Sequence, residues 1–313
     1  MPDQTRLPMP GPGPTGVPVT PAPEPDNLRG VAFALLSVLG ASLMSLGVRG
    51  AALELDSRMI VMFRAGITGL LIVIALVLFS SARRKLSFTR PGLHLLRGIL
   101  IGVSTNLGFY TLTKIPLATA TVLFFTAPIF ATILGAMFQG DRIGPRRVAA
   151  IAAGFLGALI ILRPGFGVFH PAMLTALASA TLFSVALTLS RGLAIADGAL
   201  SAYFSSVVLS VLVTLPLALP VWEIPSLPAT WISLGVLILA SAVRGVADIQ
   251  AYRYGVAAVL APVSYLRLVG IGFGAWLIFG ERIDGYTWTG AVIIIAATLY
   301  IAKREATLRH VLR

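Results

Sequence analysis

Ten apolar runs of membrane-spanning length follow one another along this chain of 313 residues, and they constrain its fold more than any other feature. A helix needs about 20 apolar residues to cross the hydrocarbon core of a bilayer, with about 17 as the usual lower limit. Divided at charged residues and at Pro/Gly breaks, the runs predict spans near 30–48, 59–79, 93–112, 117–138, 147–162, 172–190, 202–221, 231–252, 256–279 and 287–302. The predicted fold class is an all-α integral membrane protein with ten transmembrane helices.

The composition supports a bilayer as the solvent of this chain. Hydrophobic residues make up 57% of it and charged residues only 12%, about half the charged share of a soluble domain. The net charge of +12 does not indicate a nucleic-acid partner, because the basic residues fall between apolar runs rather than on one solvated face. The chain has no cysteine, which excludes disulfides, thiol catalysis and Cys-ligated metals.

The distribution of Lys and Arg predicts the orientation of the chain. With a cytoplasmic N-terminus, sixteen of the 24 basic residues lie in inside segments, five lie outside and three lie within spans. Cytoplasmic segments carry the excess of basic residues in membrane proteins. We therefore predict a multi-pass protein of the cell inner membrane with both termini cytoplasmic. Residues 1–28 are predicted to form a disordered, proline-rich cytoplasmic tail and residues 304–313 a basic one.

Two segments repeat each other at a constant offset of 140 residues. "GDRIGPRRVAAIAAGFLGALIILR" begins at Gly140, and "GERIDGYTWTGAVIIIAATLYIAK" begins at Gly280. Each is a turn with an acid–Arg pair followed by a short apolar helix. Five predicted spans separate the copies, so the copies cross the membrane in opposite directions. This pattern predicts two inverted five-helix repeats, 29–164 and 171–303, with a solute site near mid-bilayer between them.

Two longer stretches carry a resemblance to a known family: "LATATVLFFTAPIFATILGAMFQGDRI" in the first half and "AYRYGVAAVLAPVSYLRLVGIGFGAWLIFGERI" in the second. They resemble the ten-helix branch of the EamA-type family in the drug/metabolite transporter superfamily, and the resemblance covers nearly all of residues 29–303. Pro128 matches the family's fourth-helix proline, but Leu268 stands at the equivalent position of the second half, where the proline comes earlier, at Pro262. The resemblance implies export or uptake of small organic solutes, such as amino acids, nucleosides, vitamins or S-adenosyl compounds.

The ninth and eighth spans carry charged residues at similar predicted depth. Arg267 shares a helix face with Gly270 and Gly274, a GxxxG pattern that lets another helix approach closely. Arg244 and Asp248 lie one turn apart on the eighth span. Such charges are costly in a bilayer, at least about 2.5 kcal/mol each. Three readings remain open: Asp248 bridges both arginines as a brace, an arginine binds an anionic group of the solute, or the arginines reach the cytoplasmic surface.

Uncharged residues of the first half complete the predicted site. At the 140-residue offset, Arg244, Asp248 and Arg267 correspond to Ser104, Gly108 and Ala127. The aromatic residues near these positions can equally be packing residues. The candidate solute-binding residues are Arg244, Asp248, Ser264, Arg267, Asn106, Tyr110 and Phe125.

The predicted function is secondary transport of a small organic metabolite, one that carries a carboxylate, by alternating access through a central cavity. The alternative is a non-transporting membrane sensor or assembly protein whose internal charges are structural. An enzyme is not predicted, because the sequence has no Ser-His-Asp set, paired carboxylates or P-loop. No cofactor or metal is predicted either, since His94, His170 and His310 fall at span ends or in the tail. Coupling to protons or to a counter-solute, the direction of transport and the oligomeric state are left open.

Overall fold

A computed structural model describes residues 26–84, 86–139, 145–162, 169–254, 260 and 263–311. All secondary structure over these residues is helical, which confirms the predicted all-α class. The helices are α1 (Asn27–Ala51), α2 (Ser57–Leu78), α3 (Ser80–Arg83), α4 (Pro91–Lys114), α5 (Leu117–Phe124), α6 (Ala127–Gln139), α7 (Pro145–Leu162), α8 (Ala172–Ala218), η1 (Leu219–Val221), α9 (Pro228–Tyr254), α11 (Leu266–Phe279) and α12 (Gly285–Val311). Residues 1–25 of the predicted tail and the Gly140–Arg142 turn lie outside the described residues.

Six helical segments are both long and apolar enough to cross a membrane. They are Leu28–Ala51, Ser57–Leu78, Pro91–Lys114, Ala172–Ser190, Leu200–Val221 and Pro228–Asp248. Four shorter apolar helices accompany them: Leu117–Ala131, Val148–Leu162, Leu266–Phe279 and Gly285–Tyr300. The outer faces of the long helices are apolar and exposed; Leu70 and Val77 of α2, for example, are 60% and 69% exposed. Exposed apolar residues in this number are typical of helices that face lipid.

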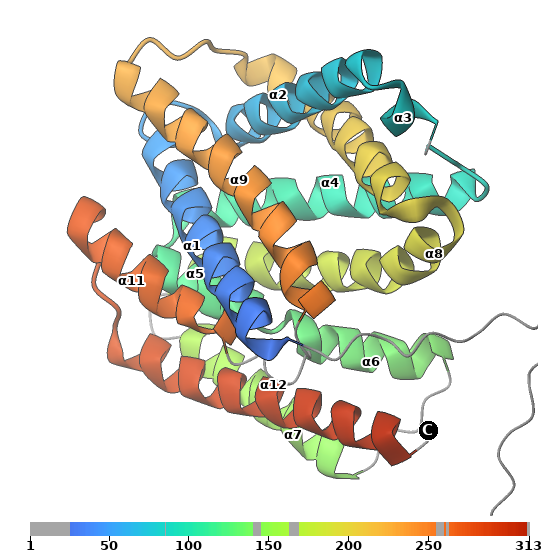
Figure 1. Cartoon of the computed structure of the whole chain (residues 1–313). Helices are drawn as coiled ribbons and strands as arrows, with labels where there is room; N and C mark the ends of the chain where they lie inside the picture. Colours follow the sequence, from blue (N-terminus) through green and yellow to red (C-terminus); the bar gives the residue numbers. More distant parts are fainter. Residues whose placement is uncertain are drawn as a thin grey trace, which may run out of the picture.

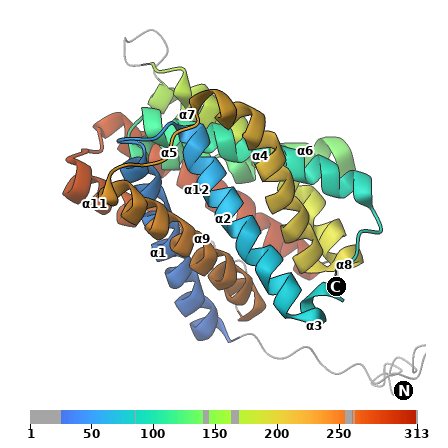
Figure 2. The same ribbon diagram turned by 90° about the horizontal axis from the view of Figure 1, so that it is seen from above.

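The helices are arranged as packed pairs around one core (Figure 1). α1 lies beside α9, and α4 lies beside both arms of α8, which folds back on itself at Gly198 (φ 82°). α7 and α12 form a third pair along one side of the molecule. Figure 2 shows α2 crossing between the α1/α9 pair and the α4/α8 pair. Gly47 permits the close approach of α1 to α9, because a Cβ atom there would lie 2.8 Å from the carbonyl oxygen of Ser233.

The fourth predicted span is interrupted in the middle. α5 ends at Phe124 and α6 begins at Ala127, with Pro128 in the first turn of α6, where its missing N–H costs least. Hydroxyl groups from other helices satisfy carbonyl oxygens at the break: Ser184 donates to Ala127 (2.6 Å) and Thr298 to Phe125 (3.5 Å). Backbone groups that leave the helical ladder inside a bilayer need such partners.

Residues separated by the repeat offset of 140 touch each other at the centre of the molecule. Phe125, in the break between α5 and α6, packs edge-to-face on Tyr265, just before α11, with ring centroids 4.9 Å apart. The α7/α12 pair shows a different consequence of the same offset, because two of its contacts are equivalent to each other. A Cβ atom at Gly154 would lie 3.6 Å from Ala297, and one at Gly157 would lie 2.9 Å from Ile294. Residue 294 is the repeat counterpart of Gly154, and residue 157 is the counterpart of Ala297. The contact of Gly154 with Ala297 is therefore equivalent to the contact of Gly157 with Ile294.

An ion pair joins the two halves at the end of the bundle where α1, α4 and α11 finish, which we term the predicted outer end. Arg49 Nη2 lies 2.8 Å from Glu281 Oε1, and Arg49 Nη1 donates to the carbonyl oxygen of Thr113 (2.8 Å). Glu281 Oε2 accepts from the backbone N–H of Leu117 (2.8 Å), at the start of α5. Gly280 ends α11 in the left-handed region (φ 67°), which turns the chain so that Glu281 faces α1.

A second carboxylate at the predicted outer end caps a helix of the other half. Glu54 accepts hydrogen bonds from the hydroxyl groups of Thr230 and Ser226 and from the backbone N–H of Ser226 (2.6 Å). These groups precede or open α9, whose N-terminus favours a negative charge. The hydrogen bond from the Thr230 hydroxyl, followed by those from Ser226, lowers the pKa of Glu54 to about 2.

A buried polar cluster occupies the opposite, predicted inner end, between α4 and the turn of α8. The Asp197 carboxylate accepts from Thr89 and Ser87 and contacts Nε2 of His94 at 3.0 Å, while His94 Nδ1 contacts the Ser205 hydroxyl at 2.8 Å. Burial raises the pKa of Asp197, but these hydrogen bonds outweigh burial and hold it well below the usual range. The cluster fixes α4 to α8, and none of its residues lines the cavity described below.

Candidate functional site

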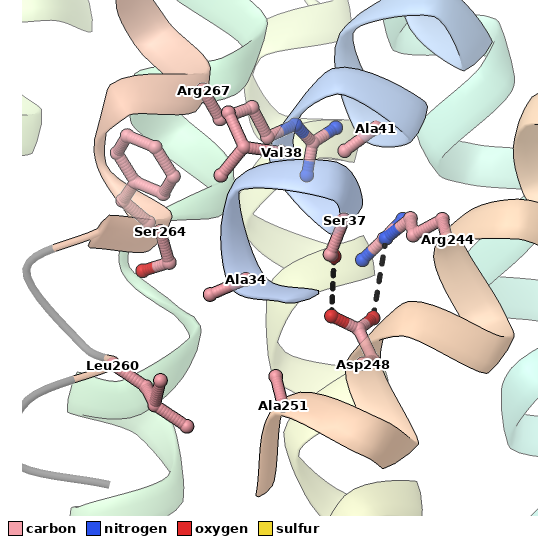
Figure 3. Close-up of a pocket in the computed structure, with 11 residues that line it drawn as sticks. Ala34, Ser37, Val38, Ala41, Arg244, Asp248, Ala251, Leu260, Ser264 and Arg267 are labelled. Carbon is pink, nitrogen blue, oxygen red and sulfur yellow. Dashed lines mark hydrogen bonds and ion pairs between the residues drawn. The ribbon is translucent and has the colours of Figure 1, made fainter. Parts of the chain in front are cut away.

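A cavity of about 110 Å³ lies between α1, α9 and the region around α11, next to the break between α5 and α6 (Figure 3). Ala34, Ser37, Val38 and Ala41 line it from α1, Arg244, Asp248 and Ala251 from α9, and Phe125, Leu260, Ser264 and Arg267 from the remaining side. Sites for drug-sized ligands usually measure about 300–1,000 Å³. In this conformation the cavity therefore has room for one end group of a metabolite, and a whole metabolite requires it to widen.

Asp248 is paired inside this cavity. Its carboxylate lies 3.6 Å from Nε of Arg244, one turn earlier on α9, and it accepts a short hydrogen bond from the Ser37 hydroxyl of α1 (Figure 3). The packing of α1 on α9 places these groups together, since Gly40 of α1 lets Arg244 approach its backbone. Arg244 also reaches the sulfur of Met44 at 4.0 Å. Asp248 is thus satisfied by one arginine and one hydroxyl.

Arg267 lines the same cavity without an acidic partner. Its Nη2 donates to the Ser45 hydroxyl of α1 (3.3 Å), and its buried Nε has no hydrogen-bond partner among the described residues. Over the same residues, no carboxylate lies within ion-pair distance of Arg267. The predicted GxxxG contact is confirmed, because Cβ atoms at Gly270 and Gly274 would lie 2.7 and 2.6 Å from Ser42 and Leu46 of α1. The predicted brace, in which Asp248 bridges both arginines, is not formed in this conformation.

The structure brings together five of the seven predicted site residues and leaves two apart. Arg244, Asp248, Ser264, Arg267 and Phe125 all line the cavity. Asn106 instead faces α8, where its Nδ2 donates to Thr214 (2.8 Å) and to the carbonyl oxygen of Gly102. Tyr110 is 37% exposed near the predicted outer end, with the Lys114 ammonium 5.9 Å from its ring centroid.

Three residues near the charged centre were missing from the predicted set. Ser37 and Ser45 supply the hydroxyl groups that bind Asp248 and Arg267. Their signal in the sequence is weak, because serines in an apolar span usually bond to their own helix. Arg64 of α2 is the third, and its guanidinium lies over the ring of Phe109, 5.3 Å from the centroid.

The sequence is similar to transporters of known solutes. The model of the EamA-like transporter family matches residues 28–163. An S-adenosylmethionine uptake transporter of Rickettsia felis is 31% identical over 283 residues, covering 89% of this chain and 94% of the relative. The chain belongs to the EamA-like transporter family. As a member of that family it is an integral membrane protein, and the relatives that it matches are named as transporters and not as enzymes.

Other relatives of this EamA-like chain handle different solutes. A riboflavin transporter of Rhizobium johnstonii is 32% identical over 69% of this chain and 71% of its own length. The pseudopaline exporter CntI of Pseudomonas aeruginosa is 29% identical over 88% of this chain and 96% of its own length. One solved crystal structure, 19% identical, matches 88% of this chain and 98% of that chain with a TM-score of 0.56, which shows a shared fold. The relatives include both uptake systems and an exporter, so family membership does not determine the direction of transport.

Proposed function

We propose that this EamA-like transporter moves a small organic solute with an anionic group, and that Arg267 binds that group. The observation that carries the proposal is the guanidinium of Arg267, which lines the cavity and has no acidic partner among the described residues. A charged group inside a membrane protein is costly and is usually retained for a ligand or ion path. Guanidinium suits this role because it stays charged when desolvated and can hold a carboxylate through two parallel hydrogen bonds.

Arg244 and Asp248 are proposed to form the adjustable part of the site. While the cavity is empty, Asp248 and Ser37 hold Arg244. A contact of 3.6 Å between Nε and the carboxylate is longer than a strong charge-assisted hydrogen bond, about 2.7–2.9 Å. An entering carboxylate can therefore compete for Arg244, and Asp248 then keeps its Ser37 partner. Coupling of this exchange to a proton or to a counter-solute stays a prediction.

Transport by alternating access between two inverted five-helix halves is the second part of the proposal. Broken helices beside the site, at Phe125 and before Leu266, are typical of carriers built from inverted repeats. The contacts related by the 140-residue offset support the same architecture. All four shorter apolar helices must cross the membrane for the predicted count of ten, with both termini at the cytoplasmic side of the inner membrane.

Solute flux into proteoliposomes tests the proposal. S-adenosylmethionine, which carries one carboxylate, and riboflavin are suitable first probes because relatives transport them. Replacing Arg267 by Ala removes a charge-assisted contact of about 1.5–3 kcal/mol, so the affinity for a carboxylate solute should fall roughly ten- to a hundredfold. Arg267→Lys should also weaken binding, because the point charge survives without the planar fork.

The yield of folded protein separates a solute ligand from a brace. Removing Arg267 leaves no carboxylate among the described residues without its ion-pair partner, so Arg267→Ala should fold at least as well as the parent. The double variant Arg267→Ala with Asp248→Ala should not recover affinity for the solute. Arg29→Ala is the matched control, since Arg29 is a surface arginine with a 70% exposed side chain. Full transport with unchanged affinity in the double variant would make Arg267 structural, and absence of flux for every solute would favour the sensor alternative.

A further inference from the structure

A groove of about 360 Å³ lies along α11, on the side of that helix away from the solute cavity. Val269, Phe273 and Trp276 line it from α11, and Arg282 and Trp288 line it where the chain turns into α12. With about 3.6 residues per turn, the lining residues of α11 point roughly opposite to Arg267, which faces the cavity. Figures 1 and 2 both show α11 at the edge of the helix bundle, so this α11 groove opens to the surroundings of the protein.

The wall of the α11 groove is apolar and exposed. Val269, Phe273 and Trp276 are 59%, 61% and 54% exposed. Gly272 keeps the floor of the groove low, because a Cβ atom there would lie 2.8 Å from Cδ1 of Ile283, which also lines the groove. Apolar side chains of this kind on the lipid-facing side of a membrane protein suit a hydrocarbon chain.

The α11 groove has the depth of one membrane leaflet. From Phe279, the last residue of α11, to Leu268, its innermost lining residue, the helix rises about 16 Å at 1.5 Å per residue. Half of the hydrocarbon core of a bilayer measures about 15 Å. Trp276 and Trp288 lie within one turn of the outer ends of α11 and α12, as tryptophan does at a membrane interface. The outer end of the groove therefore lies at the level of lipid headgroups.

A positive charge stands at this outer end. Arg282 is exposed, and it forms no ion pair over the residues that the structure describes. Glu281 also lines the groove, but its carboxylate is held by Arg49 and by the backbone N–H of Leu117, each at 2.8 Å. A guanidinium group can hold a phosphate through two parallel hydrogen bonds. The described lining residues thus offer a partner for a phosphate and no free carboxylate for the ammonium group of a zwitterionic headgroup.

We propose that the α11 groove binds an anionic phospholipid of the leaflet at the predicted outer end, with its phosphate on Arg282 and one acyl chain along α11. The charge at the outer end, the apolar wall and the depth of one leaflet together carry this inference. It goes beyond the proposed function, because no residue of the solute cavity takes part. Leu268 lines the groove next to Arg267 in the sequence, so a bound acyl chain supports from behind the helix that carries the proposed solute ligand.

Brominated lipids test this site through tryptophan fluorescence, which bromine quenches on close approach. The chain has four tryptophans, and Trp222→Phe with Trp231→Phe leaves only Trp276 and Trp288, both at the groove. The purified full chain in detergent is titrated with phosphatidylglycerol and, separately, with phosphatidylcholine, each brominated in its acyl chains. Quenching should saturate. Phosphatidylglycerol should reach half-saturation at a roughly fivefold lower concentration, the effect of one arginine near an anionic headgroup.

Substitution of Arg282 should remove this preference and keep the apolar contact. In Arg282→Gln, phosphatidylglycerol should bind as weakly as phosphatidylcholine, whose binding should not change. Val269→Phe fills the inner part of the groove and should weaken the binding of both lipids. Both variants change exposed side chains, so a melting temperature equal to that of the parent without lipid shows an intact fold. Arg58→Gln is the matched control, because Arg58 is also exposed at the predicted outer end but pairs with Asp56; it should keep the preference.

Three results would overturn the assignment. Quenching that rises with lipid concentration without saturating shows ordinary solvation by lipid. A preference for phosphatidylglycerol that persists in Arg282→Gln shows that the headgroup binds elsewhere. Protection of both tryptophans from either lipid, in a chain that migrates as a dimer, shows that a second copy covers the groove. None of these results contradicts the proposed function, since the α11 groove and the solute cavity share no lining residue among those described.

Discussion

The ion pair between Arg49 and Glu281 should hold the two halves together at the predicted outer end. Their side chains are 24% and 14% exposed, so the pair lies between a surface pair and a buried one. Surface pairs contribute about 0–1 kcal/mol, whereas breaking a buried pair costs about 3–5 kcal/mol. Glu281→Gln leaves Arg49 with the carbonyl oxygen of Thr113 as an acceptor. We therefore expect a loss of about 1–2 kcal/mol in the free energy of unfolding.

A double-mutant cycle isolates the pair from other contacts of the two residues. Arg49→Met, Glu281→Gln and the double variant are unfolded reversibly with SDS in mixed micelles. The double variant should be more stable than the sum of the single effects predicts, by about 1 kcal/mol or more. The exposed pair Asp56–Arg58, with both side chains 39% exposed, is the control and should give a smaller coupling energy. Effects of Arg49 and Glu281 that add within about 0.5 kcal/mol would refute the reasoning.

Three further predictions concern a carboxylate, a helix contact and the topology. Because the folded-state pKa of Glu54 is lowered to about 2 from 4.5, its stabilising effect is present above pH 4.5 and lost as the pH falls through 2. Glu54→Gln should therefore make the melting temperature depend less on pH over this range. A variant with the same pH dependence as the parent would contradict the capping role of Glu54. Gly290→Ala should destabilise the protein by about 1–3 kcal/mol, because its Cβ would lie 2.7 Å from the carbonyl oxygen of Gly157. Gly66→Ala is the control and should stabilise α2, because nothing lies within 4 Å of its Cβ. Equal melting temperatures of the two variants would disprove this packing. A cysteine at Pro145 should be protected from impermeant external reagents in intact cells, and its labelling would reverse the predicted orientation.

Hydropathy predicted the long helices well because lipid imposes a strong and simple constraint. The predicted spans 59–79 and 172–190 correspond to Ser57–Leu78 and Ala172–Ser190. The contact at Gly270 and Gly274 was also predictable, since small residues one turn apart on a helix have few roles besides close packing. The break at Phe125 was harder to predict. Pro128 alone is compatible with a helix start or a kink, and the hydroxyl groups that stabilise the break come from distant helices.

The charged site was predicted only where charge itself was the signal. Arg244, Asp248 and Arg267 stand out in apolar spans, and the structure places them around one cavity. Asn106 and Tyr110 were selected because they lie near Ser104 and Gly108, the counterparts of Arg244 and Asp248 at the repeat offset. Nearness in sequence gives the depth of a residue but not the direction that its side chain faces. Arg64 was not selected, because its position near a helix end is equally typical of an arginine that reaches the membrane surface. The Phe109 ring beside it belongs to α4, a helix distant from Arg64 in the sequence.

The contacts between α7 and α12 have a consequence for how the protein can be handled. In the proposed transport cycle the two inverted halves exchange conformations, and each residue then takes the place of its counterpart 140 positions away. The contact of Gly154 with Ala297 then becomes that of Gly157 with Ile294, so the pair of helices is mapped onto itself. The interface between α7 and α12 therefore keeps the same contacts in both access states. Rigid fusion partners or binding proteins attached along α7 and α12 should therefore leave the rate of transport unchanged.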